Sequence, residues 1–77
     1  MRHIIDIFDV ETESLLMSID IPPHRENDLA QLMGWQTPEE GIYGYDLSAE
    51  QVKTLEEWTG IAIESPHSIV QLIGVED

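Results

Sequence analysis

The sequence predicts an α+β domain, in which a mainly antiparallel sheet of four to five strands packs against two short helices. Three observations predict this class. The N-terminal part alternates apolar and polar residues with the period of strands, two later segments have the spacing and end signals of helices, and the C-terminal part contains apolar segments of strand length. The expected order is ββαβαββ, with both helices on one face. A length of 77 residues is that of one domain, so residues 1–77 are expected to form a single domain.

The first two strands are expected to form an antiparallel hairpin. Residues 2–10 (RHIIDIFDV) have apolar side chains at both odd and even positions, so this strand is predicted to be covered on both faces. Residues 10–13 (VETE) make a connection of hairpin length without an Asn-Gly signal, which favours a type I turn. Residues 14–21 alternate more regularly and give the second strand a single core face, formed by Leu15, Met17, Ile19 and Ile21.

The first helix is predicted over residues 24–33. The two prolines before it end the second strand, because neither can donate to a ladder, and Gly34 supplies the left-handed residue that closes a helix. In the segment that follows, Thr37, Pro38 and Glu40 resemble the start of a one-turn helix that Gly41 ends. We therefore expect a structured loop between the first helix and the next strand.

The second helix has the clearest local signals in the chain. A third strand is expected over residues 42–47, and Ser48 and Gln51 then make a capping box that begins a helix at Ala49. Gly60 ends this helix. Two further strands are predicted over residues 61–65 and 68–75.

The expected core consists of apolar residues from every predicted element. They are Ile5, Ile7, Phe8, Leu15, Met17, Ile19, Leu29, Leu32, Val52, Leu55, Ile61, Ile63, Ile69 and Leu72.

Charge is the most unusual feature of the composition. Sixteen Asp and Glu against three Lys and Arg give a net charge of −13. Phosphate-binding surfaces need clustered basic side chains, so nucleic acid and anionic lipid are disfavoured as ligands and a basic protein is the natural partner. The chain has no cysteine, which fits the cytoplasm, and no apolar run long enough to span a membrane.

No pattern in the sequence predicts catalysis, a metal or a cofactor. The three histidines, His3, His24 and His67, lack ligand spacing, and a calcium loop at residues 9–14 would need glycine where Ser14 stands. No serine lies in a nucleophile elbow. Paired carboxylates occur, but neighbouring side chains on a helix or strand point apart. We therefore expect a noncatalytic protein with no cofactor.

Acidic and aromatic residues gather between residues 35 and 58, which suggests an interface: aromatic side chains supply binding energy, and carboxylates steer cationic partners. The alternative is that the aromatic residues fill the core or cover the sheet, which applies to Trp35, Tyr43, Tyr45 and Trp58. The predicted partner-binding residues are Trp35, Glu39, Glu40, Tyr45, Asp46, Glu50, Glu56 and Glu57.

Two motifs carry a resemblance to a known class of proteins. The hairpin RHIIDIFDVETESLL and the strand-to-helix junction YDLSAEQVKTLEE are similar to small bacterial immunity proteins of polymorphic toxin and contact-dependent growth inhibition systems. The resemblance implies a cytoplasmic protein that binds and neutralises a cognate toxin, often a nuclease with a basic surface. It transfers no binding residue, so the residues above follow from charge and aromatic content alone.

Other functional classes remain open on the sequence. A nucleic-acid mimic would need carboxylates in a regular row along one face. An acidic regulatory or structural subunit would expose an apolar patch and form oligomers, whereas the present expectation is a monomer or weak dimer. An enzyme would need a deep pocket with two convergent carboxylates or a histidine-acid pair.

Overall fold

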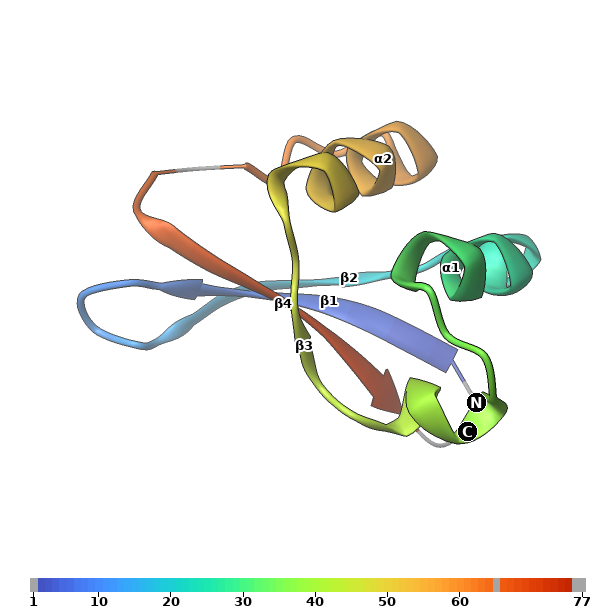
Figure 1. Ribbon diagram of the computed structural model, residues 1–77. Coiled ribbons are helices and arrows are strands. Elements are labelled where there is room, and N and C mark those ends of the chain that lie inside the picture. Colours follow the sequence, from blue (N-terminus) through green and yellow to red (C-terminus); the bar gives the residue numbers. More distant parts are fainter. Residues whose placement is uncertain (1, 65, 76–77) are drawn as a thin grey trace.

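The computed structural model describes residues 2–64 and 66–75, which form a sheet and two α-helices (Figure 1). Two 3₁₀ turns, η1 and η2, precede α1 and β3. In chain order the elements are β1 (Arg2–Asp9), β2 (Leu15–Asp20), η1 (Pro23–Arg25), α1 (Glu26–Met33), η2 (Pro38–Ile42), β3 (Tyr45–Asp46), α2 (Ala49–Thr59) and β4 (Ser68–Val75).

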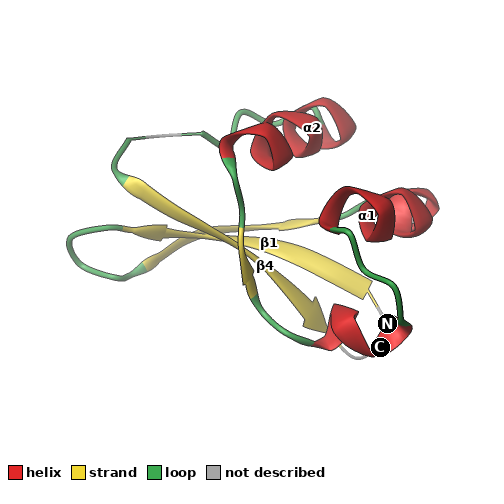
Figure 2. Cartoon of the chain, viewed as in Figure 1, coloured by secondary structure: helices red, strands yellow, loops and turns green. Residues whose placement is uncertain are grey.

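The sheet, whose strands are yellow in Figure 2, has the order β2-β1-β4-β3. Every neighbouring pair is antiparallel. β1 and β4 pair along their full length, from Arg2 opposite Val75 to Asp9 opposite Ser68. The first and last strands of the described chain are therefore the two central strands, and β2 and β3 are the edges.

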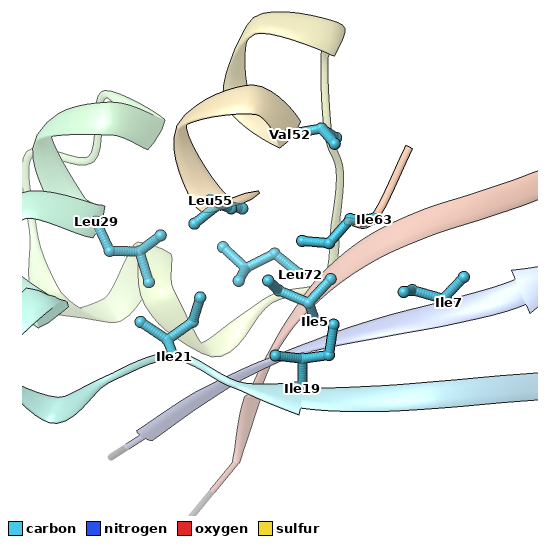
Figure 3. Close-up of a cluster of buried hydrophobic side chains, with 9 residues drawn as sticks. All are labelled: Ile5, Ile7, Ile19, Ile21, Leu29, Val52, Leu55, Ile63 and Leu72. Carbon is cyan, nitrogen blue, oxygen red and sulfur yellow. The ribbon is translucent and has the colours of Figure 1, made fainter. Parts of the chain in front are cut away.

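Both helices lie on one face of the sheet, which confirms the predicted α+β class (Figure 1). The odd-numbered residues of β1 point toward the helices, and Leu72 of β4 joins them from the neighbouring strand. Between the layers lie nine buried apolar side chains: Ile5, Ile7, Ile19, Ile21, Leu29, Val52, Leu55, Ile63 and Leu72 (Figure 3). Eight of these nine were predicted as core.

The rest of the predicted core is more exposed than expected. Leu32 is half-buried and packs against the core. Phe8 is half-buried on the outer face, and Leu15, Met17, Ile61 and Ile69 are exposed. The prediction was wrong for these five. Four of them belong to the sheet, where the helices cover only one face and the hairpin extends past the helices (Figure 1), and Ile61 lies in the loop after α2.

For the same reason β1 is not covered on both faces as predicted. Its even-numbered residues face away from the helices, and among the described residues no element packs over that face. Ile4, Asp6 and Phe8 are only half-buried there, shielded by neighbouring strands.

The hairpin turn is held by Asp9, whose Oδ1 accepts hydrogen bonds from the backbone N–H groups of Glu11 at 2.8 Å and Thr12 at 3.1 Å. These bonds, that of Thr12 first, hold the pKa of Asp9 below its usual value, because they stabilise the charged carboxylate. Glu13 closes the turn with φ of 62°, in the left-handed region.

The helix ends follow the predicted signals. Ser48 Oγ accepts from Gln51 N–H at 3.2 Å, and Gln51 Oε1 accepts from Ser48 N–H at 2.9 Å, so the capping box is confirmed. Gly34 and Gly60 have φ of 74° and 71°, the left-handed conformation that ends a helix. The first helix is predicted correctly in extent, although its first turn is the separate 3₁₀ turn η1.

Two predicted strands differ from the structure. The strand expected over residues 42–47 shortens to β3, because η2 continues through Ile42. The strand expected over residues 61–65 does not form over residues 61–64, and Ser65 lies outside the described residues. Instead, Glu56 Oε2 accepts from the N–H groups of Ile63 at 2.6 Å and Glu64 at 3.0 Å, which satisfies backbone groups that a strand would have paired.

Candidate functional site

The eight predicted partner-binding residues fall into two groups in the structure. Glu39, Asp46, Glu50 and Glu57 are exposed. Trp35, Glu40, Tyr45 and Glu56 are half-buried and contact neighbouring parts of the chain. The first group can meet a partner directly, whereas the second group also maintains the fold.

Glu40 organises the turn η2. Its Oε2 accepts hydrogen bonds from the backbone N–H groups of Gln36 and, at 3.1 Å, Thr37. Together with Thr37 it forms a capping box, so the predicted helix start at this point is confirmed. Its carbonyl oxygen also accepts the hydroxyl of Tyr45 at 2.6 Å. Glu40 therefore fixes the loop that precedes β3.

Trp35 stands between two other rings. Its ring centroid lies 5.2 Å from that of His3 and 5.6 Å from that of Tyr45, at tilted angles. These are the spacings of favourable aromatic pairs. Because Tyr45 is opposite Leu72 in the sheet, its ring is on the helix side of β3. The alternative that these two aromatic residues pack against the fold describes their contacts well.

The imidazole of His3 also joins three elements of the fold. It is only 7% exposed, and its Nε2 lies 2.8 Å from the carbonyl oxygen of Gly41 while its Nδ1 lies 2.6 Å from Glu26 Oε1. A carbonyl only accepts, so Nε2 carries the proton. A hydrogen bond between Nδ1 and Glu26 Oε1 needs a second proton. With that proton on the ring the two side chains form a charged pair, and with it on the carboxyl group they form a neutral pair. Both ring nitrogens are occupied, which suits a structural contact between β1, α1 and η2.

A pocket of about 370 Å³ opens beside this contact. Two buried polar atoms at its wall, Glu26 Oε2 and Trp35 Nε1, have no hydrogen-bond partner among the described residues. The pocket is lined by His3, Glu26, Asn27, Ala30, Trp35, Gln36, Thr37 and Gly41. No sequence signal pointed to it, because its residues come from four separate parts of the chain.

Glu56 has its own structural role, since it receives the two N–H groups of residues 63 and 64 described above. The bonds from Glu64 and then Ile63 lower the pKa of Glu56, because they favour its charged form. Its neighbour Glu57 is exposed.

Two exposed apolar residues lie among the predicted acids. Ile42 is 51% exposed and Tyr43 is 60% exposed, and they stand in the chain between the exposed carboxylates of Glu39 and Asp46. We call these four residues the η2–β3 surface. The prediction placed Tyr43 in a strand beside Tyr45, whereas the strand begins only at Tyr45. The glycines at 41 and 44, which interrupt the apolar run, were the signal that could have shown this.

The predicted acids Asp46, Glu50 and Glu57 lie on β3 and α2. Asp46 is on the outer face of the sheet, where its Oδ1 accepts from Gln71 Nε2 at 3.2 Å. Glu50 lies in the first turn of α2, soon after β3 in the chain, and Glu57 lies in its last turns. The structure thus places Glu39, Asp46 and Glu50 along one continuous segment and Glu57 farther along the helix.

The described residues contain neither a metal-binding cluster nor a membrane-spanning helix. Within residues 2–64 and 66–75, no three His, Cys, Asp or Glu side chains are grouped as metal ligands would be. The helices in this part of the chain are too short and polar to cross a membrane.

Comparison with known proteins identifies a family. Residues 2–72 match the family described as a domain of unknown function, DUF7683, and the chain belongs to it. No curated protein and no solved structure matches the chain.

Proposed function

We propose that this member of the DUF7683 family is a noncatalytic binding protein that docks a basic protein partner through the η2–β3 surface. The observation that carries the proposal is the exposure of Ile42 and Tyr43, which the exposed acids Glu39 and Asp46 flank in the chain. Exposed tyrosine is a frequent anchor of protein interfaces, and surrounding carboxylates select a cationic partner.

The balance of charge over the chain supports a basic partner. Only three Lys and Arg accompany sixteen Asp and Glu. One of them, Arg25, is engaged within the fold: its Nη1 donates to Asp28 Oδ2 at 3.0 Å, and its guanidinium lies over the ring of Trp58 at 5.3 Å. The excess negative charge attracts a basic protein over the range of the Debye length and accelerates its association.

The partner we propose is a cognate toxin domain with a basic surface, such as a nuclease, which this protein would neutralise in the cytoplasm. Occupation of the toxin's substrate-binding surface requires only complementary charge and an apolar anchor. It requires no bond-making by the inhibitor, and the two nitrogens of His3 are already occupied within the fold.

The test is the association rate with the protein encoded beside this one, measured from roughly 0.01 M to 1 M ionic strength, over which the Debye length falls from about 30 Å to about 3 Å. The pair Glu39→Lys and Asp46→Lys should slow association at least about tenfold at low salt and have no effect at high salt. The matched control is Glu11→Lys with Glu64→Lys, which makes the same change in net charge at exposed positions outside the η2–β3 surface.

Equal slowing by both pairs would show that net charge alone acts, and the η2–β3 surface would then be rejected. Failure of the neighbouring protein to bind at any salt concentration would reject it as the partner.

A further inference from the structure

The exposed apolar side chains of the described residues concentrate at a second place, the hairpin end of the sheet. Val10, Leu15, Leu16, Met17 and Ile69 are five of the eight large apolar residues that are exposed. Phe8 lies opposite both Leu15 and Ile69, so it joins them on the outer face. Next to Phe8 a hollow of about 320 Å³ is lined by Phe8, Glu13, Ile69 and Gln71.

This apolar end includes the free edge of the sheet, because β2 has a neighbour only on the β1 side. The N–H of Ile21 donates to the carbonyl of His3 at 3.0 Å, which fixes the phase of the ladder. In an antiparallel pair the bonded residues alternate, so Ile19 and Met17 also direct their backbone groups toward β1. Ser18 and Asp20 must then direct their N–H and carbonyl groups outward, where an added strand could pair.

A β-bulge limits where pairing can occur. Ile7 is opposite Met17 and Phe8 is opposite Leu15, so Leu16 is the extra residue and has no partner on β1. The regular part of the free edge is therefore residues 17–20. Met17 at its start is 48% exposed, although it is on the same face of the sheet as the core residues Ile19 and Ile7.

Charge decides what could bind there. Residues 2–21 carry five acidic residues against one arginine: Asp6, Asp9, Glu11, Glu13 and Asp20 against Arg2. A second copy of this chain would bring the same negative charge to the interface, which opposes self-pairing. A segment with lysine or arginine beside its apolar residues would instead be attracted.

We propose that the free edge of β2 binds an extended protein segment in which apolar and basic side chains alternate, added as a fifth strand beside residues 17–20. The backbone groups of Ser18 and Asp20 supply the hydrogen bonds, the exposed Met17 supplies the apolar contact on the helix side of the sheet, and Asp20 with the acids of the turn sets the preference for a basic segment. This surface is separate from the η2–β3 surface and does not depend on the function proposed for it.

The probe is a short acetylated and amidated peptide of alternating valine and lysine, titrated into the ¹⁵N-labelled full chain. We expect the amide signals of residues 15–20 to shift, the amides of Ser18 and Asp20 to become protected from hydrogen exchange, and a Kd below about 1 mM. The same peptide with glutamate in place of lysine should not bind. Shifts confined to the η2–β3 surface, equal binding of the acidic peptide, or no binding would each overturn the proposal.

Two variants separate strand pairing from side-chain contact. Ser18→Pro removes an outward N–H and keeps the hydrogen bonds between β2 and β1, so it should raise the Kd of the peptide at least about tenfold. Ser18→Ala removes only the hydroxyl that donates to Asp6 Oδ1 at 2.6 Å, and should bind like the parent chain. Met17→Lys, whose backbone is unaltered, should weaken binding by a similar factor even if the proline variant does not fold. Unchanged affinity in Met17→Lys, or in a folded Ser18→Pro, would reject this edge as the site.

Discussion

His3 in the first strand and Glu26 at the start of α1 are joined by a contact of 2.6 Å, and the other nitrogen of His3 reaches the carbonyl of Gly41. One buried imidazole thus connects the sheet, the first helix and the loop that carries the η2–β3 surface. We expect His3→Ala to lower the free energy of unfolding by about 2–3 kcal/mol, because it leaves Glu26 and the Gly41 carbonyl without their partner. A double-mutant cycle with Glu26→Ala in urea denaturation should give a coupling energy of about 1–3 kcal/mol. His24→Ala, at an exposed histidine, is the control, and additive effects of the two substitutions would contradict this account.

Gly41 is required by the close approach of two side chains. A Cβ at this position would lie 3.1 Å from His3 Nε2 and 3.3 Å from Trp35 Cζ3. We expect Gly41→Ala to destabilise the fold by about 1–3 kcal/mol, since the rings must move apart. Gly44→Ala is the matched control, because the nearest atom to its Cβ is the Leu72 carbonyl oxygen at 3.9 Å. Thermal unfolding of the two variants would measure the difference, and equal melting temperatures would refute it.

Glu13 adopts a backbone conformation that favours glycine. Its φ of 62° places Cβ near a carbonyl oxygen, at a cost of roughly 1 kcal/mol for an ordinary residue. Glu13→Gly should therefore raise the free energy of unfolding, by up to about 1 kcal/mol. Glu11→Gly, in the same turn but without a positive φ, should lower it. Chemical denaturation that ranks the two variants in the opposite order would show that the turn has another conformation in solution.

Acid should weaken the contacts made by Glu56. Its pKa is lowered in the folded state by the Glu64 and Ile63 N–H groups, so the stability it contributes is present above the pKa of the unfolded chain. That contribution is lost as the pH falls through the lower, folded pKa, below about pH 4.3. Glu56→Gln should therefore show a shallower loss of stability between about pH 6 and pH 3 than the parent chain. Glu57→Gln, which removes the same charge at the exposed neighbour, is the comparison variant, and a slope in Glu56→Gln identical to that of the parent would contradict the assignment.

Tyr43 should matter for binding and little for stability. Because its side chain is 60% exposed, Tyr43→Ala should change the unfolding free energy by less than about 0.5 kcal/mol. In the complex with the neighbouring protein it should raise the dissociation rate by at least about tenfold. Ile61→Ala, at an exposed apolar residue after α2, is the control for surface truncation. An unchanged dissociation rate would remove Tyr43 from the interface.

The parts of the fold that depend on local chemistry could be predicted from the sequence. The Ser48–Gln51 capping box and the helix-ending residues Gly34 and Gly60 involve only neighbours in the chain, so the local sequence was enough to predict these helix ends. The class of the fold followed from the periods of the segments. Burial of Leu15 was predicted wrongly because the bulge at Leu16 turns it to the outer face with Phe8, which simple alternation cannot show. Met17 keeps the core side, but alternation does not tell how far the helices extend over it.

The candidate site was predictable only in its composition. The sequence identified the acids Glu39 and Asp46, which are exposed. Glu40 and Glu56 were also identified, but their carboxylates accept hydrogen bonds from backbone N–H groups. That role depends on how the loops return to the helices. The contact of His3 with Glu26 joins residues 23 positions apart, and nothing in the local pattern of either residue indicates the other.

The full-length pairing of β1 with β4 has a consequence for synthesis of the chain. While the ribosome is still producing α2, β1 has only β2 beside it, and the position that β4 will occupy is open. The nascent hairpin then exposes Ile5 and Ile7 on one face, so the middle of the sheet can close only after β4 emerges. Arrest of translation before that point should leave a chain that chaperones recognise, whereas release of the last strand should end that recognition in a single cooperative step.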